Sequence, residues 1–434
     1  MDIGNTEEKE VKDDYDVLTE LEKDLGEKFD ALFPKKERDN GSGMFEEKDN
    51  IYHLLGYDKC GIQIGEHLYV PNIKRGSKNI FLAGQYGSGK TTSFTIPNVL
   101  NELGSYIVLD QDGEVYNKTK QTLINDGYKV VKLSDGVSFL SLLKTDDDVD
   151  FICSSLINYF SNHDTFYNPD KELTLFKAIV YFSISVYDTV EEQLNNMITM
   201  FTYTQEKLIE VFKLLPESHP AYQQFALIKD IPLNSFENIK ATVSTKLAKL
   251  IGKEVISVID NNVIDYEEFY NDTRIAFFID YDLNVNNEFY AKTILDFFIH
   301  VLTRKHEKEK VHNTYFILDG IDRIPMLYSL SDGMLVAKNR RNFFSILVTS
   351  IEALSSKYNR KDDYIYDTCD TKIYYKSNLA DNNRYFGDLF DGMYVSDFNK
   401  IKISEDEMIV FENGLKPFIW KKTFYFNNPN WFEI

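Results

Sequence analysis

Residues 80–92 read Ile-Phe-Leu-Ala-Gly-Gln-Tyr-Gly-Ser-Gly-Lys-Thr-Thr, with two glycines separated by four residues and followed by Lys-Thr. The apolar residues 80–83 are typical of a buried strand, and residues 91–102 are typical of a helix. A loop of this spacing between a strand and a helix cradles phosphate, because its glycines let successive N–H groups point at phosphate oxygens. A chance glycine-rich turn does not explain the agreement of spacing and context.

The same stretch predicts a nucleotide site with assigned roles. Lys90 is expected to reach the β- and γ-phosphates, and the hydroxyl of Thr91 is expected to bind Mg²⁺. ATP and Mg²⁺ are therefore the expected cofactors. The residues predicted to bind the nucleotide are Gly84, Gln85, Tyr86, Gly87, Ser88, Gly89, Lys90, Thr91 and Thr92.

The bulk composition is that of a large globular protein, with 434 residues, 43% hydrophobic and 27% charged. A formal net charge of −21 argues against a generally basic nucleic-acid-binding protein and leaves room only for a local basic channel. Cys60, Cys153 and Cys369 have no metal-binding spacing and suit a reducing compartment. We recognise no signal peptide or membrane span, and expect a cytoplasmic protein held at the inner face of the cell membrane by a partner or a removed segment.

Changes in composition and periodicity divide the chain into four predicted segments. Residues 1–50 are acidic and expected to be partly disordered, with a short amphipathic helix at 18–32. Residues 51–148 form the first part of a nucleotide-binding domain and residues 254–434 the second part. Residues 149–253 show only helical periodicity, with breaks expected at Pro216, Pro220 and Pro232, and are predicted to form an inserted all-α domain.

The strands expected on either side of this insertion define the fold class. A hairpin is expected at 61–71, and strands at 80–83, 106–109 and 129–133 alternate with helices. Further strands are expected at 274–281, 314–319, 344–348 and 372–375, followed by a hairpin at 407–420. Strands alternating with helices predict a central, mostly parallel sheet of an α/β protein.

Catalytic residues are sought where a second strand ends beside the phosphate loop. Asp319 ends an apolar strand and is predicted to help hold Mg²⁺, because a phosphate loop needs an acidic partner on a neighbouring strand. The next position, Gly320, lacks the usual glutamate that activates water, and Asp322 is a candidate substitute. Arg340 and Arg341 are either arginines that complete a neighbouring subunit's site or a pair of solvated or phosphate-tracking cations.

The order of these parts resembles the conjugative coupling ATPases of type IV secretion systems, the TraG/TraD type. The phosphate loop is followed by Ile-Pro-Asn at 96–98, and Asp110-Gln-Asp-Gly-Glu114 resembles the family's Asp-Pro-Lys-Gly-Glu segment. The helical block lies where the family inserts its all-α domain. The strand ending at Asp319, the segment Arg323-Ile-Pro325 and the strand ending at Thr349-Ser350 resemble its second nucleotide motif and the following Gln-Ser segment. This resemblance implies a RecA-like P-loop nucleotide-binding domain.

Three positions depart from the family pattern. Gly320 stands in place of the catalytic glutamate, Thr349 in place of the glutamine expected to sense the γ-phosphate, and Asp112 in place of a lysine. Nucleotide binding tolerates such changes better than fast hydrolysis does. The sequence therefore leaves it undecided whether the protein turns ATP over.

The resemblance implies a hexameric coupling ATPase at the cytoplasmic mouth of a secretion channel. Its implied partners are a relaxase or relaxosome accessory protein, the channel's ATPases and membrane components, and DNA passing through a ring channel. The all-α domain is the implied docking site for cargo. Two alternatives are a hydrolysis-deficient nucleotide-binding receptor or scaffold of the same machinery, and an FtsK-like DNA motor outside secretion.

Overall fold

The computed structural model describes residues 45–56, 61–72, 74, 76–159, 169–250, 264–281, 285–358, 362–390 and 395–427. The amphipathic helix predicted at 18–32 and Cys60 lie outside this part of the chain. Among the described residues, no helix combines the length and apolar character needed to cross a membrane.

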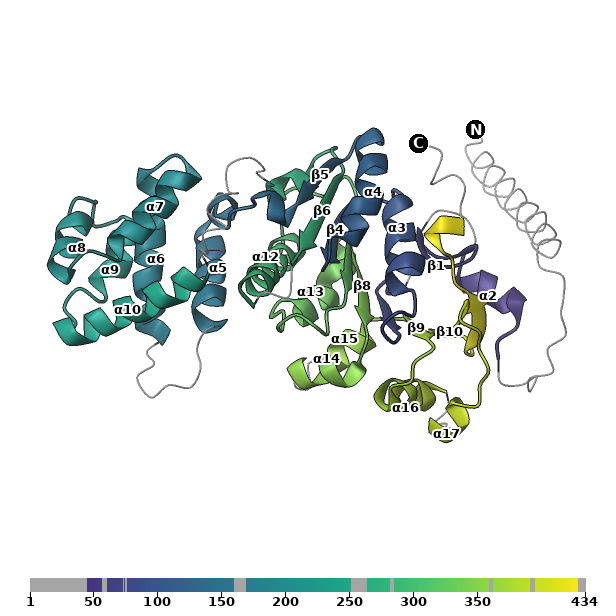
Figure 1. Ribbon diagram of the computed structural model, residues 1–434. Coiled ribbons are helices and arrows are strands. Elements are labelled where there is room, and N and C mark those ends of the chain that lie inside the picture. The colour runs from purple at the N-terminus through teal and green to yellow at the C-terminus, as the bar shows by residue number, and fades with distance from the viewer. Residues whose placement is uncertain are drawn as a thin grey trace, which may run out of the picture. The chain divides into compact units, whose positions relative to one another are not determined.

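A nine-stranded sheet forms the centre of the molecule (Figure 1), in the spatial order β11-β10-β9-β3-β8-β7-β4-β6-β5. The seven strands from β9 to β5 are parallel, and the C-terminal hairpin adds β10 and β11 antiparallel at one edge. The strands are β3 (Ile80–Ala83), β4 (Ser105–Asp110), β5 (Lys129–Lys132), β6 (Ile275–Asp280), β7 (Thr314–Asp319), β8 (Asn342–Val348), β9 (Thr371–Tyr375), β10 (Glu407–Glu412) and β11 (Phe418–Lys421). The predicted α/β class with a mostly parallel sheet is confirmed.

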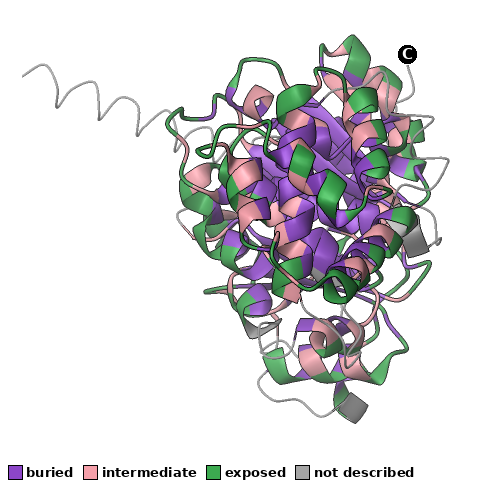
Figure 2. Ribbon diagram, turned by 90° about the vertical axis from the view of Figure 1, so that its left-hand side faces the viewer, coloured by how far each residue is buried: buried purple, intermediate pink, exposed green. Residues whose placement is uncertain are grey.

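The apolar runs of the central strands explain why this sheet forms. Every residue of β3, β4 and β8 is buried, as Figure 2 shows for the strands beneath the surrounding helices. Parallel strands covered by helices on both faces need such continuous apolar sequence. A separate two-stranded hairpin, β1 (Gly61–Gly65) and β2 (Leu68–Pro71), forms where the sequence predicts one.

The crossover helices and the helices around the C-terminal half complete the α/β part. The connection from β3 to β4 contains η1 (Thr91–Thr95) and α3 (Ile96–Leu100), and the connection from β4 to β5 contains α4 (Glu114–Asn125). The second half contains η4 (Tyr266–Tyr270) before β6 and α12 (Val285–Thr303) after it. The remaining elements are α2 (Lys48–Leu54), η2 (Leu133–Asp135), η3 (Leu140–Leu142), α13 (Leu330–Val336), η5 (Ala337–Arg340), α14 (Ile351–Tyr358), α15 (Asp362–Asp367), α16 (Ala380–Leu389), α17 (Val395–Phe398) and η6 (Tyr425–Asn427).

A block of helices is inserted between β5 and β6, as predicted. It consists of α5 (Asp146–Tyr159), α6 (Pro169–Val186), α7 (Val190–Met200), α8 (Gln205–Phe212), α9 (Pro220–Ala226) and α10 (Leu233–Leu250). The break expected at Pro220 is confirmed, because α8 ends at Phe212 and α9 begins at Pro220, where the ring nitrogen of His219 caps the new helix by accepting the N–H of Ala221. Proline fits the first turn of a helix, where its missing N–H has no intrahelical partner.

A buried ion pair ties three of the inserted helices together. The ammonium of Lys246 on α10 lies 2.7 Å from the carboxylate of Glu172 on α6, with both side chains almost fully buried. The same ammonium donates to the backbone oxygen of Ile157 on α5. Loss of one partner of such a buried pair leaves an uncompensated charge, so this contact favours a single arrangement of the helices.

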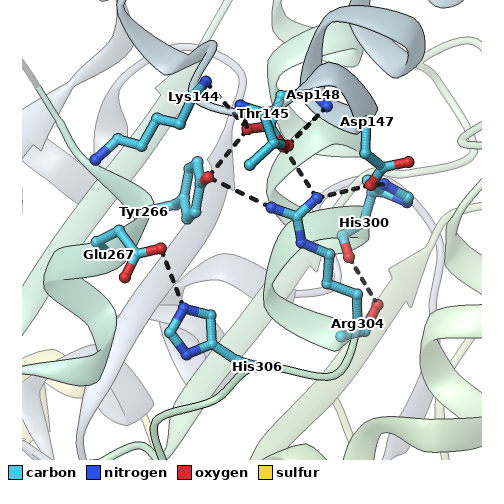
Figure 3. A network of polar contacts seen from close by, with 10 residues as sticks. Lys144, Thr145, Asp147, Asp148, Tyr266, Glu267, His300, Arg304 and His306 are labelled. Carbon is cyan, nitrogen blue, oxygen red and sulfur yellow. Dashed lines mark hydrogen bonds and ion pairs between the residues drawn. The ribbon is translucent and has the colours of Figure 1, made fainter.

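A second polar network joins the first turn of α5 to the α/β part (Figure 3). Arg304, directly after α12, lies 2.7 Å from the carboxylate of Asp147 and 3.0 Å from that of Asp148. Asp148 is fully buried and also accepts the hydroxyl of Tyr266 from η4. His300 of α12 contacts Asp147 at 3.0 Å. The start of the helical block is therefore fixed to α12 and η4 by charge as well as by packing.

Candidate nucleotide-binding site

The phosphate loop leaves the carboxyl end of β3 and enters η1. Gly87 and Gly89 have φ values of 77° and 86°, which glycine adopts without strain. A side-chain carbon at Gly89 would also lie 3.1 Å from the ring of Phe424, so this glycine is required for space as well as for conformation. The loop geometry is thus set by the glycines that define the sequence motif.

Lys90 lies at the centre of this loop. Its buried ammonium donates to the backbone oxygens of Gly84 at 2.6 Å and Gln85 at 3.2 Å, and lies 3.5 Å from the hydroxyl of Thr349. Burial lowers the pKa of Lys90, and the carboxylate of Asp319 opposes this shift. The loop therefore holds a cation inside its own curve, where an anionic ligand would bind.

Thr91 and Asp319 come together as predicted from the sequence. The Thr91 hydroxyl donates to Oδ2 of Asp319 at 2.7 Å, and the Thr95 hydroxyl donates to the same oxygen at 3.1 Å. A hydroxyl and a carboxylate are the oxygen ligands that Mg²⁺ prefers. This donor pair fits the predicted metal site, although its role as a site remains a prediction.

The structure places Asp322 near the loop but gives its carboxylate a structural role. Oδ2 accepts the backbone N–H groups of Thr349 at 3.0 Å and Ser350 at 2.9 Å, which fastens the end of β8 to the turn after β7. Within the described part of the chain no donor reaches the other carboxylate oxygen, Oδ1, which is buried. Asp322 thus remains a candidate base, with one oxygen already committed to the backbone.

Arg340 and Arg341 lie at the amino ends of the parallel strands, whereas the phosphate loop lies at their carboxyl ends. They directly precede β8, whose first residue pairs in register with Thr314, the first residue of β7. Arg341 donates to the backbone oxygen of Lys310 and to the side chain of Asn313. A seven-residue strand spans roughly 20 Å, so the two arginines do not reach the loop of the same copy. Both alternatives, a role in a neighbouring subunit's site and a pair of solvated or phosphate-tracking cations, therefore stay predictions.

A cleft of about 310 Å³ opens in front of the loop. One wall is formed by residues of the phosphate loop and another by the segment from Leu109 to Val115, with Asp319 and Arg323 between them. Asp110, the last residue of β4, accepts the N–H groups of Val115 and Tyr116 at the start of α4. Burial raises the pKa of Asp110 to about 6, with contributions from the nearby carboxylates of Asp280 and Asp319.

Arg323 belongs to a segment that resembles the family's second nucleotide motif, but the sequence did not predict that its side chain lines this cleft. Its guanidinium donates to the side-chain oxygen of Gln111 at 2.9 Å and to the hydroxyl of Thr349 at 3.2 Å. It also lies over the ring of Tyr86, 5.4 Å from the ring centre. The available signal was its position four residues after a strand-ending aspartate, but that spacing alone does not show where the side chain points.

The C-terminal hairpin supplies a second contact that the sequence did not reveal. The buried ammonium of Lys422 donates to the backbone oxygen of Ser88 at 3.0 Å and lies 4.1 Å from the ring centre of Tyr375. Burial lowers the pKa of Lys422 to about 8. Lys422 therefore contacts the backbone of the phosphate loop although it lies 334 positions further along the chain.

This combination of sheet, loop and strand-end carboxylate defines the class of protein. A parallel α/β sheet carries a phosphate loop after one strand, an aspartate after another and an all-helical insertion, which is the RecA-like P-loop nucleotide-binding fold predicted from the sequence.

Comparison with known proteins agrees with the predicted resemblance. Residues 35–139 match the family model described as type IV secretory system conjugative DNA transfer. No protein of curated function matches the sequence.

Solved structures of two other proteins share the fold. The unbound coupling protein TrwB lacking its first 70 residues superposes with a TM-score of 0.62 at 10% identity, over 90% of this chain and 99% of that chain. TrwB in complex with ADP and Mg²⁺ gives the same TM-score and identity over 89% and 95%. VirB4 of Thermoanaerobacter pseudethanolicus gives 0.57 at 11% identity, over 87% and 100%. The resemblance to the conjugative coupling proteins is therefore confirmed, and these identities show a common fold.

Proposed function

We propose that this protein binds ATP with Mg²⁺ and acts as a coupling protein of a conjugative type IV secretion system. Lys90 would contact the β- and γ-phosphates, while the hydroxyl of Thr91 and the carboxylate of Asp319 would hold Mg²⁺. The metal would neutralise phosphate charge when bound. TrwB, which has the same fold, is known in complexes with ADP and Mg²⁺ and with a non-hydrolysable ATP analogue.

The 2.7 Å contact between Thr91 and Asp319 carries this proposal. The two residues are far apart in the chain, since Thr91 begins η1 and Asp319 ends β7, yet their oxygens already meet beside Lys90. Such preorganisation lowers the cost of ordering side chains when a ligand binds. A phosphate loop kept only as a structural turn would not need an aspartate from β7 at the hydroxyl.

Nucleotide titration of the Lys90→Ala variant tests the proposal. Removing the ammonium deletes a charge-assisted contact worth about 1.5–3 kcal/mol, so ATP affinity should fall roughly ten- to a hundredfold. Lys118→Ala is the matched control, because Lys118 is exposed on α4 outside the cleft. Equal affinity for wild type and Lys90→Ala, with both proteins folded by circular dichroism, would refute this assignment.

The resemblance to the conjugative coupling proteins supports a proposed place for the protein in secretion. It would form a hexamer in which Arg340 and Arg341 complete the nucleotide site of the neighbouring copy. The helical block would recruit a relaxase or accessory protein at the inner face of the membrane, and the ring would pass cargo to the channel's ATPases and membrane components. Size measurement with and without nucleotide, compared between wild type and Arg340→Ala, tests the assembly.

The alternative function within the same machinery is a receptor that binds ATP but hydrolyses it slowly. Gly320 favours this alternative, because the position directly after Asp319 carries no carboxylate. A general base typically raises the rate of a reaction about 10²–10⁴-fold. Turnover near 10 s⁻¹, a usual enzyme rate, would favour the motor instead. An FtsK-like DNA motor outside secretion is the third candidate, for which the inserted helical block offers no support.

A further inference from the structure

Gly320 occupies the position of the missing glutamate, and another side chain lies beside it. A carbon placed where a side chain would begin at Gly320 would lie 3.6–3.8 Å from Cδ, Nε and Cζ of Arg323. The stem and head of the arginine therefore pass over the place from which a glutamate would project. At this position the cleft presents a guanidinium where a carboxylate would otherwise stand.

Three nucleotide-binding segments hold this guanidinium in place. Gln111 follows β4, Thr349 follows β8, and Tyr86 lies in the phosphate loop with 79% of its surface exposed. Each supplies a neutral partner: an amide oxygen, a hydroxyl oxygen and an aromatic face. The arginine is thus oriented without being neutralised, and its planar fork keeps donors available for a further acceptor.

The charges around Arg323 point to an anionic ligand. Over the residues that the structure describes, no carboxylate comes within 4.0 Å of its guanidinium nitrogens to form an ion pair. The hydroxyl oxygen of Thr349 lies 3.2 Å from Arg323 and 3.5 Å from the ammonium of Lys90. Two cations that share one hydroxyl repel each other, and Arg323 contributes to the low pKa of Lys90. An anion between them would relieve this repulsion.

The position of that anion along the nucleotide follows from the sheet order. Thr349 follows β8, which lies between β3 with the phosphate loop and β7 with Asp319. Lys90 is assigned to the β- and γ-phosphates and lies near the hydroxyl of Thr349. Arg323 contacts that hydroxyl from the β7 side. An oxygen that contacts both cations therefore belongs to the terminal phosphate rather than to the phosphates nearer the nucleoside.

We propose that Arg323 binds the terminal phosphate of a nucleoside triphosphate in the same copy that supplies Lys90, and so makes the site discriminate ATP from ADP. This inference rests on the proposed nucleotide-binding function. Arginine stays protonated and cannot take a proton from water. Arg323 would therefore hold the triphosphate without replacing the missing base, which gives the cleft a means to report nucleotide state.

Binding of ADP and of a non-hydrolysable ATP analogue, each with Mg²⁺, tests the inference on the full chain. In Arg323→Ala the affinity for the triphosphate analogue should fall roughly ten- to a hundredfold, as for loss of a charge-assisted contact, while ADP affinity stays within about twofold. Arg323→Lys keeps the charge but loses the fork and should fall between the two. Arg384→Ala, exposed on α16 and outside the cleft lining, should match wild type.

The possible outcomes distinguish failure of the inference about Arg323 from failure of the proposed nucleotide-binding function. If Arg323→Ala weakens both nucleotides equally, or neither, the inference is overturned while the nucleotide site stands. If wild type binds neither nucleotide, the proposed function fails and the inference fails with it. Arg323 is exposed, so loss of fold is not expected, and an unchanged melting temperature of Arg323→Ala would show that lost affinity is local.

Discussion

At the scale of single residues, Gly320 explains why the missing glutamate cannot simply be restored. Its φ of 80° lies in the left-handed region, where residues with a side chain are strained by roughly 1–2 kcal/mol. The first side-chain carbon would lie 3.6 Å from Cδ of Arg323, which is an ordinary van der Waals contact, so the cost is that of the backbone. The turn after β7 therefore favours glycine at position 320. Comparison with the family pattern suggests a glutamate there, but the backbone conformation disfavours that substitution.

We expect Gly320→Glu to be destabilised without a gain in ATP turnover. The free energy of unfolding, measured by urea denaturation, should fall by about 1–2 kcal/mol, and Gly320→Ala should fall by a similar amount because the cost is that of the backbone. A Gly320→Glu variant that is as stable as wild type and hydrolyses ATP at least tenfold faster would contradict this reading of the turn.

The sequence predicted the residues whose roles depend on local spacing and missed those placed by the fold. Lys90 and Thr91 follow from the loop motif, and Asp319 from the end of an apolar strand. Arg323 could not be found in the same way, because its direction depends on the positive φ of Gly320 and on partners from other strands. Lys422 is positioned by the edge hairpin, which local sequence does not connect to the phosphate loop.

At the scale of elements, the strands were predicted best because burial on both faces leaves a continuous apolar signal. The run in β7 was predicted with the bounds that the structure shows, Thr314–Asp319. Short helices were harder: α9 has seven residues and begins with proline, and α16 is poor in apolar residues. Such helices are stabilised by tertiary packing rather than by their own sequence pattern, so the spacing of apolar residues predicts them poorly.

Asp110 links two elements, since it ends β4 and caps α4 while its pKa is raised to about 6 by burial. An unfolded aspartate has a pKa of about 3.9, so the native state binds the proton more tightly. Stability contributed by this group is present below about pH 4 and is lost as the pH rises to about 6. Two pKa units correspond to on the order of 2–3 kcal/mol.

Comparison with Asp110→Asn isolates this effect, because asparagine keeps an acceptor for α4 and removes the charge. Between about pH 4 and pH 6, the unfolding free energy of wild type should decline relative to that of the variant, and the two curves should run parallel outside this window. Parallel curves across the whole range would show that the carboxylate of Asp110 titrates normally in the folded protein.

At the scale of the whole molecule, the candidate nucleotide cleft and the candidate docking surface lie on different parts of the chain. The cleft residues gather at the carboxyl edge of the parallel strands, and in the described chain the helical block contributes none of them. The block instead presents exposed carboxylates on α7 and α8, namely Glu191, Glu192, Glu206 and Glu210. A phosphate backbone needs clustered lysine and arginine, so this surface suits a protein partner better than DNA.

We propose two exposed leucines as contacts for such a partner. Leu214, just after α8, is 83% exposed, and Leu227, just after α9, is 72% exposed. Neither side chain supports the core, so substitution should change stability by less than about 0.5 kcal/mol. A minority of interface residues, concentrated at the well-packed centre, contribute more than about 1 kcal/mol each to binding, and we expect these two leucines to be among them.

The double variant Leu214→Ser/Leu227→Ser should therefore bind ATP as wild type does but capture cargo protein at least tenfold more weakly, because two such contacts are lost. The measurement is binding of a purified relaxase or accessory protein to the full chain, with Ile124→Ser as control, since Ile124 is 53% exposed on α4 outside the block. Unchanged capture by the double variant would place the cargo contact elsewhere. Lost ATP binding would show that the block and the nucleotide cleft are coupled rather than separate.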